Sequence, residues 1–196
     1  IPESYQDCSY LMLGNLAPAI QRQVIRGMKN RPKLIAMDTM NFWMDIAMDD
    51  LKETISLVDV LTINDEEARQ LSGEYSLLLA AEKIQEMGPK YLIIKKGEHG
   101  ALLFHGREMF YAPALLLPSV ADPTGAGDTF AGGFMGYLKS TDDVSFENMK
   151  RALVYGSALA SFTVQRFGTE KIKEVSSAEL ESRMNEFKSL MSFTHK

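Results

Sequence analysis

The sequence has 196 residues, of which 45% are hydrophobic and 24% charged, and its formal net charge is −5. These values are ordinary for one folded domain, and an acidic chain without a cluster of Lys and Arg argues against a nucleic-acid partner. The single cysteine, Cys8, excludes an intrachain disulfide and fits a reducing, cytoplasmic compartment. No apolar run approaches the roughly 18–20 residues of a membrane-spanning helix, so no membrane partner is expected.

Apolar runs typical of strands alternate with amphipathic stretches typical of helices along the first half of the chain. In chain order, the expected elements are strand 10–13, helix 19–28, strand 34–37, helix 51–57, strand 58–63, helices 66–71 and 77–87, and strand 91–94. Such repeated units with continuous apolar strands predict an α/β fold, a mostly parallel sheet flanked by helices on both faces. Ligands of such sheets bind beyond the carboxyl ends of the strands.

The second half of the chain begins with an expected antiparallel pair of strands, 101–104 and 108–112. Three long helical patterns then follow, at residues 126–139, 145–167 and 177–191. Small side chains recur along 145–167, which predicts close packing of that helix against a neighbour. We expect Gly168 to end the helix as its C-cap.

Asn64 and Glu67 directly follow the expected strand 58–63. The Asn-x-x-Glu spacing places Asn64 at a helix cap and Glu67 one turn inside the helix. These residues either form a plain capping box or offer oxygen ligands to Mg²⁺, an ion that keeps part of its hydration shell. From the residues alone, the plain cap is the commoner of the two.

Residues 95–100 read Lys-Lys-Gly-Glu-His-Gly and lie between two expected strands. The glycines permit close approach of the backbone to a ligand, and the lysines could meet a phosphate. The alternative is a simple hairpin whose glycines adopt positive φ.

Residues 122–130 read Asp-Pro-Thr-Gly-Ala-Gly-Asp-Thr-Phe and stand at the start of the expected helix 126–139. Gly125, Ala126 and Gly127 leave almost no side chain over that start, so its unpaired N–H groups can bind an anion. A bound anion would repel the Asp128 carboxylate, so a carboxylate at this place needs a functional reason. A general base beside a phosphate site is such a reason. The string is not a Walker loop, because no Lys-Ser or Lys-Thr follows the glycines.

The whole string 122–130 resembles the C-terminal motif of the ribokinase-like (PfkB) family of carbohydrate and nucleoside kinases. The resemblance implies that Asp128 is the catalytic base and that Gly125, Ala126 and Gly127 build the anion hole. It also implies that the cofactors are ATP and Mg²⁺.

The upstream motifs resemble the same family. The Asn-x-x-Glu motif implies that Asn64 and Glu67 organise Mg²⁺ and the ATP phosphates. Residues 95–100 resemble the family's Gly-x-x-Gly turn along the nucleotide, although family members often have Thr in place of Lys95. The residues implied to bind the nucleotide are Lys95, Gly97, Gly100, Asn64 and Thr124.

Two further correspondences concern the acceptor and a second cation. Residues 38–43 resemble the Asp-x-Asn-x-Arg stretch of some sugar kinases, but the spacing is one residue longer and the Arg is absent. Asp38 and Asn41 are therefore expected to position substrate or phosphate, and the neighbouring Phe42 and Trp43 to pack. Some family members bind a monovalent cation such as K⁺, which here would involve Asp122 and Gly168.

The resemblance predicts an ATP-dependent phosphotransferase that acts on a hydroxyl of a sugar or sugar-like small molecule. The alternatives are a nucleotide- or ligand-binding module without catalysis, and a nucleoside or vitamin-precursor kinase of the same architecture. Relatives carry further βα units and a small β lid before the first expected strand. We therefore expect residues 1–196 to form a single domain that lacks these N-terminal parts. Formation of a homodimer is left open.

Overall fold

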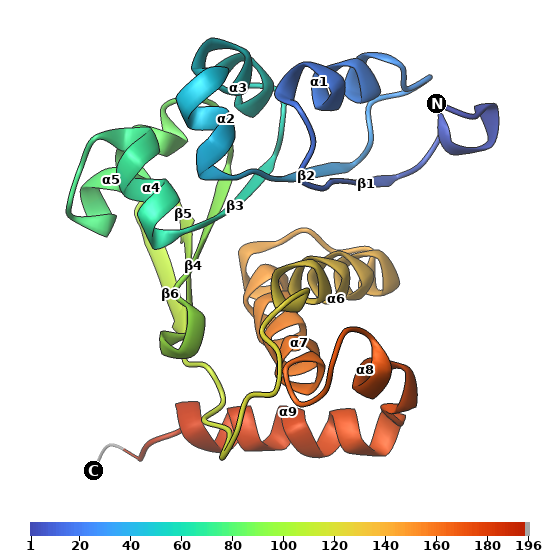
Figure 1. Cartoon of the computed structure of the whole chain (residues 1–196), viewed down its shortest axis with the longest axis vertical. Helices are drawn as coiled ribbons and strands as arrows, with labels where there is room; N and C mark the ends of the chain where they lie inside the picture. The colour runs from blue at the N-terminus through green and yellow to red at the C-terminus, as the bar shows by residue number, and fades with distance from the viewer. Residues whose placement is uncertain (195–196) are drawn as a thin grey trace. The chain divides into compact units, whose positions relative to one another are not determined.

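The computed structural model describes residues 1–194, which fall into two compact units. Unit 1 comprises residues 1–96 and 102–110, and unit 2 comprises residues 97–101 and the chain from Tyr111 onward. Each unit has its own helices (Figure 1). Within the described residues, no helix is both long enough and apolar enough to cross a membrane.

The sheet has six strands in the order in which they occur along the chain. They are β1 (Tyr10–Leu13), β2 (Leu34–Asp38), β3 (Val60–Asn64), β4 (Tyr91–Lys95), β5 (Ala101–His105) and β6 (Glu108–Ala112). Strands β1 to β4 pair in parallel. Strand β5 follows β4 after five residues and β6 follows β5 after two, too few for a parallel crossover, so both are antiparallel to their neighbours. The predicted α/β fold with a mostly parallel sheet is confirmed.

Five helices of unit 1 lie along one face of this sheet (Figure 1). They are α1 (Pro18–Arg26), α2 (Asn41–Ile46), α3 (Met48–Ile55), α4 (Asp65–Ser72) and α5 (Leu77–Gln85), and a 3₁₀ turn, η1 (Glu3–Tyr5), precedes β1. Alternate strand residues such as Ile35, Leu61 and Leu92 form one apolar cluster with the helices. Leu34 and Val60 point to the opposite face and are buried as well. Burial on both faces explains why these strands read as continuous apolar runs.

Helix α2 is an element that the sequence pattern did not predict. It has only six residues and no side-chain hydrogen bond at its N-cap, Met40. Phe42 packs edge-on against Trp43, with the ring centroids 4.9 Å apart, although 49% of its surface is exposed. Trp43 is partly buried and its Nε1 donates a hydrogen bond to Asn15 Oδ1 at 2.8 Å.

Unit 2 contains the 3₁₀ turn η2 (Gly97–His99) and four helices, α6 (Ala126–Thr141), α7 (Phe146–Thr163), α8 (Glu170–Glu174) and α9 (Ser177–Met191). Helices α6 and α7 cross where two glycines meet: a Cβ on Gly133 would lie 3.0 Å from Gly156 Cα. The close packing predicted from the small side chains of α7 is confirmed. The predicted C-cap is wrong, because α7 ends at Thr163 with Val164 as its cap, and Gly168 lies beyond it with φ 54°.

The substitution Gly156→Ala is expected to lower the free energy of unfolding by about 1–3 kcal/mol. The new methyl group would lie 2.6 Å from the carbonyl oxygen of Phe130, so the two helices would have to move apart. Gly136→Ala is the matched control, because this helical glycine is exposed and has no atom within 4 Å of the added Cβ. It should raise stability by about 0.5–1 kcal/mol through helix propensity. Urea unfolding of both variants measures the difference, and equal effects would contradict the close crossing.

The start of α9 gives a prediction on acid stability. Hydrogen bonds from the Lys171 ammonium and from Ser176 lower the pKa of Glu179 from 4.5 to about 2. A carboxyl group with a lowered pKa stabilises the folded chain above its unfolded pKa, and this contribution disappears as the pH falls from about 4.5 to about 2. The variant Glu179→Gln should therefore be less stable than the parent at pH 7, and the difference should shrink towards pH 3. Urea unfolding at both pH values tests this, with the exposed Glu181→Gln of the same helix as control.

Candidate active site

The carboxyl ends of β2 and β4 bring two of the predicted site residues together. Lys95 Nζ lies 3.1 Å from Asp38 Oδ2 and 3.3 Å from Asp38 Oδ1. Only 23% of the lysine side chain and 15% of the aspartate side chain are exposed. Because β3 separates the two strands, this ion pair bridges β3. A partly buried ammonium at this edge of a parallel sheet is available to an anionic ligand.

Asn64 and Glu67 form a capping box at the start of α4. Glu67 Oε2 accepts a hydrogen bond from the backbone N–H of Asn64 at 2.7 Å, and Asn64 Oδ1 accepts one from the N–H of Glu67 at 2.8 Å. Glu67 is buried. Burial raises the pKa of Glu67 above its usual value. The Asn64 N–H and the Lys95 ammonium act in the opposite direction and lower this pKa, whereas the Asp38 carboxylate raises it further. Glu67 therefore lies within electrostatic reach of the Asp38–Lys95 pair.

Asn64 and Glu67 suit a Mg²⁺ ion that keeps most of its water ligands better than one bound by protein atoms alone. Asn64 Oδ1 and one oxygen of Glu67 are already engaged in the cap. Residues 1–194 contain no group of three or more His, Cys, Asp or Glu that could hold a metal by themselves. Mg²⁺ commonly keeps several waters and binds one or two carboxylates together with substrate phosphates, and this donor set suits that mode.

Asn41 lies in a different set of contacts. Its Nδ2 donates to Gln70 Oε1 at 2.6 Å, and Gln70 Nε2 donates to Asp45 Oδ1 at 2.7 Å. These bonds link α2 to α4. The amide of Asn41 is thus engaged in joining two helices, and its expected role at the substrate stays a prediction.

Three buried polar side chains near the strand ends were missed by the sequence analysis. Gln21, Thr39 and Thr62 each carry one oxygen without a hydrogen-bond partner among residues 1–194. Gln21 Nε2 donates to the carbonyl oxygens of Gly14 and Asp38, at 2.7 and 3.0 Å. Little in the sequence marked these residues as buried polar groups, because Thr is common in strands and a single Gln does not interrupt a helical pattern.

In unit 2, the predicted Gly-x-x-Gly turn needs both of its glycines. Gly97 and Gly100 have φ 55° and 92°. A Cβ on Gly100 would lie 2.1 Å from the carbonyl oxygen of Ala112, a distance that no side chain can adopt. The turn is the 3₁₀ turn η2, and its expected contact with a nucleotide stays a prediction.

The start of α6 is open, as the sequence predicts. Gly125 is its N-cap with φ 79°, and no side chain caps the helix. The N–H of Ala126 donates to Pro123 O at 3.2 Å, whereas the amides of Gly127 and Asp128 have no acceptor among the described residues 1–194. Gly125, Ala126 and Gly127 are half-buried and Asp128 is exposed. Two free amides beside an accessible carboxylate can bind an anion and accept a proton.

The loop before α6 brings together Asp122, Thr124 and Gly168. Asp122 Oδ1 accepts a hydrogen bond from the backbone N–H of Thr124 at 2.9 Å. The pKa of Asp122 is lowered, chiefly by this N–H and then by the Thr124 hydroxyl and the backbone of Gly168. The backbone N–H of Ala121 also donates to Val164 O at 2.8 Å, just after α7. The carboxylate is thus kept ionised next to Gly168.

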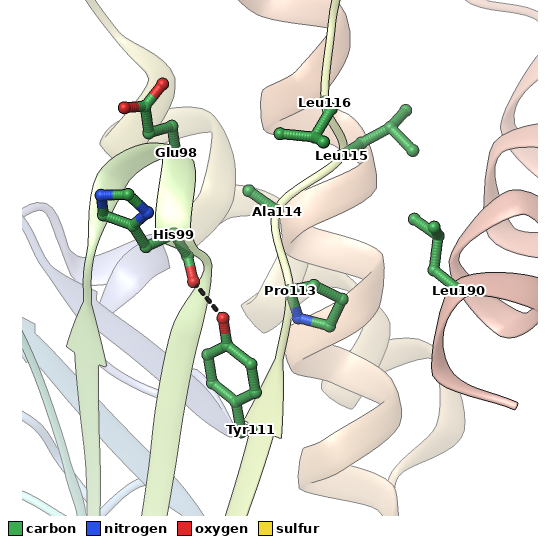
Figure 2. Close-up of a pocket in the computed structure, with 8 residues that line it drawn as sticks. All are labelled: Glu98, His99, Tyr111, Pro113, Ala114, Leu115, Leu116 and Leu190. Atoms are coloured by element: carbon green, nitrogen blue, oxygen red, sulfur yellow. Dashed lines mark hydrogen bonds between the residues drawn. The ribbon is translucent and has the colours of Figure 1, made fainter. Parts of the chain in front are cut away.

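Unit 2 also holds a pocket of about 370 Å³ beside the η2 turn. Figure 2 shows its lining, with Tyr111 Oη donating a hydrogen bond to His99 O at 2.5 Å and Leu190 of α9 opposite. Leu115 and Leu116, from the segment after β6, complete an apolar wall. Neither Asp128 nor residues 125–127 line it. Nothing in the spacing of these apolar residues distinguished them from core residues.

Comparison with known proteins gives a family match over most of the chain. The sequence model of the pfkB family carbohydrate kinases matches residues 4–175. A cytidine kinase from Thermococcus kodakarensis is 30% identical over 144 residues, covering 71% of this chain and 51% of that protein. A ribokinase from Lactococcus lactis is 33% identical over 137 residues, covering 68% of this chain and 42% of that protein.

A solved structure shares the fold. The crystal structure of a ribokinase from Thermotoga maritima superimposes with a TM-score of 0.70 at 28% identity, covering 90% of this chain and 57% of that one. The chain thus spans about half the length of the relatives it matches.

Proposed function

This chain belongs to the pfkB family of carbohydrate kinases, and from that premise we propose that the protein carrying it transfers the γ-phosphate of ATP to a hydroxyl of a sugar or nucleoside. The observation that carries the proposal is the open start of α6, where the free amides of Gly127 and Asp128 adjoin the Asp128 carboxylate. The relatives include a cytidine kinase and ribokinases, which supports both acceptor classes. The single Cys8 supports a cytoplasmic location.

The mechanism follows from the chemistry of this helix start. Asp128 takes the proton from the acceptor hydroxyl as its oxygen attacks the γ-phosphorus in line. A new bond forms between that oxygen and phosphorus, the bond from the γ-phosphorus to the bridging oxygen breaks, and ADP leaves. The amides of Gly127 and Asp128, with Gly125 and Ala126 around them, stabilise the negative charge on the transferring group.

Other predicted residues would bind and orient the nucleotide. Lys95 would donate hydrogen bonds to phosphate oxygens, and Asn64 and Glu67 would hold the waters of Mg²⁺. Mg²⁺, when bound, supplies positive charge that offsets the charge of the phosphates. Gly97, Gly100 and Thr124 would approach the nucleotide through their backbone. Asp122 and Gly168, which lie next to each other, would bind a monovalent cation such as K⁺ through their oxygen atoms.

A substrate screen tests the proposal. ADP production by the protein that carries this chain is measured with Mg·ATP and a panel of sugars and nucleosides, and calorimetry records Mg·ATP binding on the same sample. Turnover with one acceptor class is the expected result. Binding without turnover on any acceptor would favour a ligand-binding module, and neither binding nor turnover would refute a kinase.

A further inference from the structure

Thr62 lies in β3 and carries a buried hydroxyl group. The residue is 1% exposed, and its Oγ1 has no hydrogen-bond partner among residues 1–194. Burial of an unpaired hydroxyl costs free energy, so most such groups in native proteins have a partner, including ordered water or a ligand. Val has nearly the same β-branched shape and the same preference for strands, without a polar group to satisfy.

The strand register places this hydroxyl beside the Asp38–Lys95 ion pair. Thr62 is in register with Asp38 of β2, and Asn64 is in register with Lys95 of β4. Residues in register on parallel strands point to the same face, and so do residues two apart on one strand. Lys95 therefore crosses β3 on the face that carries Thr62, opposite to the apolar cluster of Ile35 and Leu61.

The chemistry of this patch suits a phosphate group that arrives with a divalent cation. The Lys95 ammonium and the Thr62 hydroxyl are both hydrogen-bond donors, and oxyanions accept from such donors. The carboxylates of Asp38 and Glu67 would repel a bare anion, but they favour an anion that is complexed with Mg²⁺. A nucleotide carries its phosphate chain in this form.

We propose that Thr62 is a ligand-binding residue, whose hydroxyl donates a hydrogen bond to a phosphate oxygen of a Mg²⁺–nucleotide complex next to Lys95. This inference rests on the proposed function, because it names a further contact of the same nucleotide site. In the free protein, Asp38 is the partner of the Lys95 ammonium. In the ligand-bound protein, a phosphate oxygen would be the hydrogen-bond acceptor that the Thr62 hydroxyl lacks among residues 1–194.

A pair of isosteric substitutions tests the proposal. Thr62→Val removes the unpaired hydroxyl, so the melting temperature of the ligand-free protein should stay unchanged or rise. Thr54→Val is the matched control: Thr54 is 0% exposed, and its hydroxyl oxygen lies 3.0 Å from Pro18 O and 2.8 Å from Asp50 O, so its one proton has an acceptor. That control should melt at a lower temperature than the parent.

Calorimetry with Mg·ADP provides the second readout. Thr62→Val should weaken binding about 10- to 100-fold, the cost of one hydrogen bond to a charged group, and Thr62→Ser should restore it. Thr54→Val should leave the affinity unchanged. A Thr62→Val protein that melts as early as Thr54→Val, or that binds Mg·ADP like the parent, would overturn the proposal.

The same experiment separates this inference from the proposed function. If the parent binds Mg·ADP through Thr62 but phosphorylates no acceptor, the inference stands and the kinase proposal fails. If the parent phosphorylates an acceptor while Thr62→Val binds Mg·ADP normally, only the inference fails. A parent that neither binds Mg·ADP nor phosphorylates any acceptor would overturn both.

Discussion

Replacing Asp128 by Asn is expected to lower kcat by about 10²- to 10⁴-fold in the protein that carries this chain, because a general base is lost. The amide side chain of Asn has nearly the same shape but cannot take the proton of the acceptor hydroxyl. The backbone amides of α6 are untouched, so the Kd of Mg·ATP should change little. Steady-state kinetics and calorimetry on the same sample measure the two effects.

The matched control for this substitution is Asp49→Asn. Asp49 is also an exposed carboxylate in the first turn of a helix, α3, but no feature of the proposed site includes it. Both variants remove one negative charge from the first turn of a helix. Equal rates for Asp128→Asn and Asp49→Asn would show that Asp128 is not the base.

Replacing Gly100 by Ala is expected to lower the free energy of unfolding by about 3–5 kcal/mol. Two causes add up, because the backbone has φ 92° and the new Cβ would lie 2.1 Å from Ala112 O and 2.8 Å from Ala114 N. Urea unfolding of the purified variant measures the loss.

Gly106→Ala separates these two causes. Gly106 has φ 56° but no atom within 4 Å of an added Cβ, so only the backbone conformation is penalised. Its substitution should cost about 1–2 kcal/mol. If Gly100→Ala were no more costly than Gly106→Ala, the close approach at Ala112 would be wrong.

Periodicity and apolar runs predicted most of the strands because the sheet is buried on both faces. Leu34 to Met37 and Tyr91 to Ile94 are apolar without interruption, and the structure extends each strand by one polar residue, Asp38 or Lys95. Short or irregular segments were harder to predict. Helix α2 has no side-chain cap to mark its start. The helix expected over 145–167 extends four residues beyond Thr163, where α7 ends.

The candidate site could be predicted where its parts are local in the sequence. The Asn64–Glu67 box and the open start of α6 each lie within a few residues, and the structure has both. The contact of Lys95 with Asp38 joins residues 57 positions apart, so no spacing rule could indicate it. Asp38 was expected to position substrate or phosphate, a role that stays a prediction, and in the structure it pairs with Lys95. The unpaired hydroxyl of Thr62 depends on packing, which only coordinates reveal.

The sequence of α6 is poorly suited to an independent helix. Four of its 16 residues are glycine, Gly127, Gly132, Gly133 and Gly136, and each costs about 1 kcal/mol of helix propensity relative to Ala. The helical conformation of α6 must then be stabilised by its packing against α7. The two helices meet at the crossing near Gly156 and through the hydroxyl groups of Thr129 and Thr163, which lie 3.0 Å apart. Substitutions in α7, which touch no reactant, should consequently loosen the amides around Asp128. In a mutational scan, substitutions in α7 should therefore reduce turnover, although α7 contributes no catalytic residue.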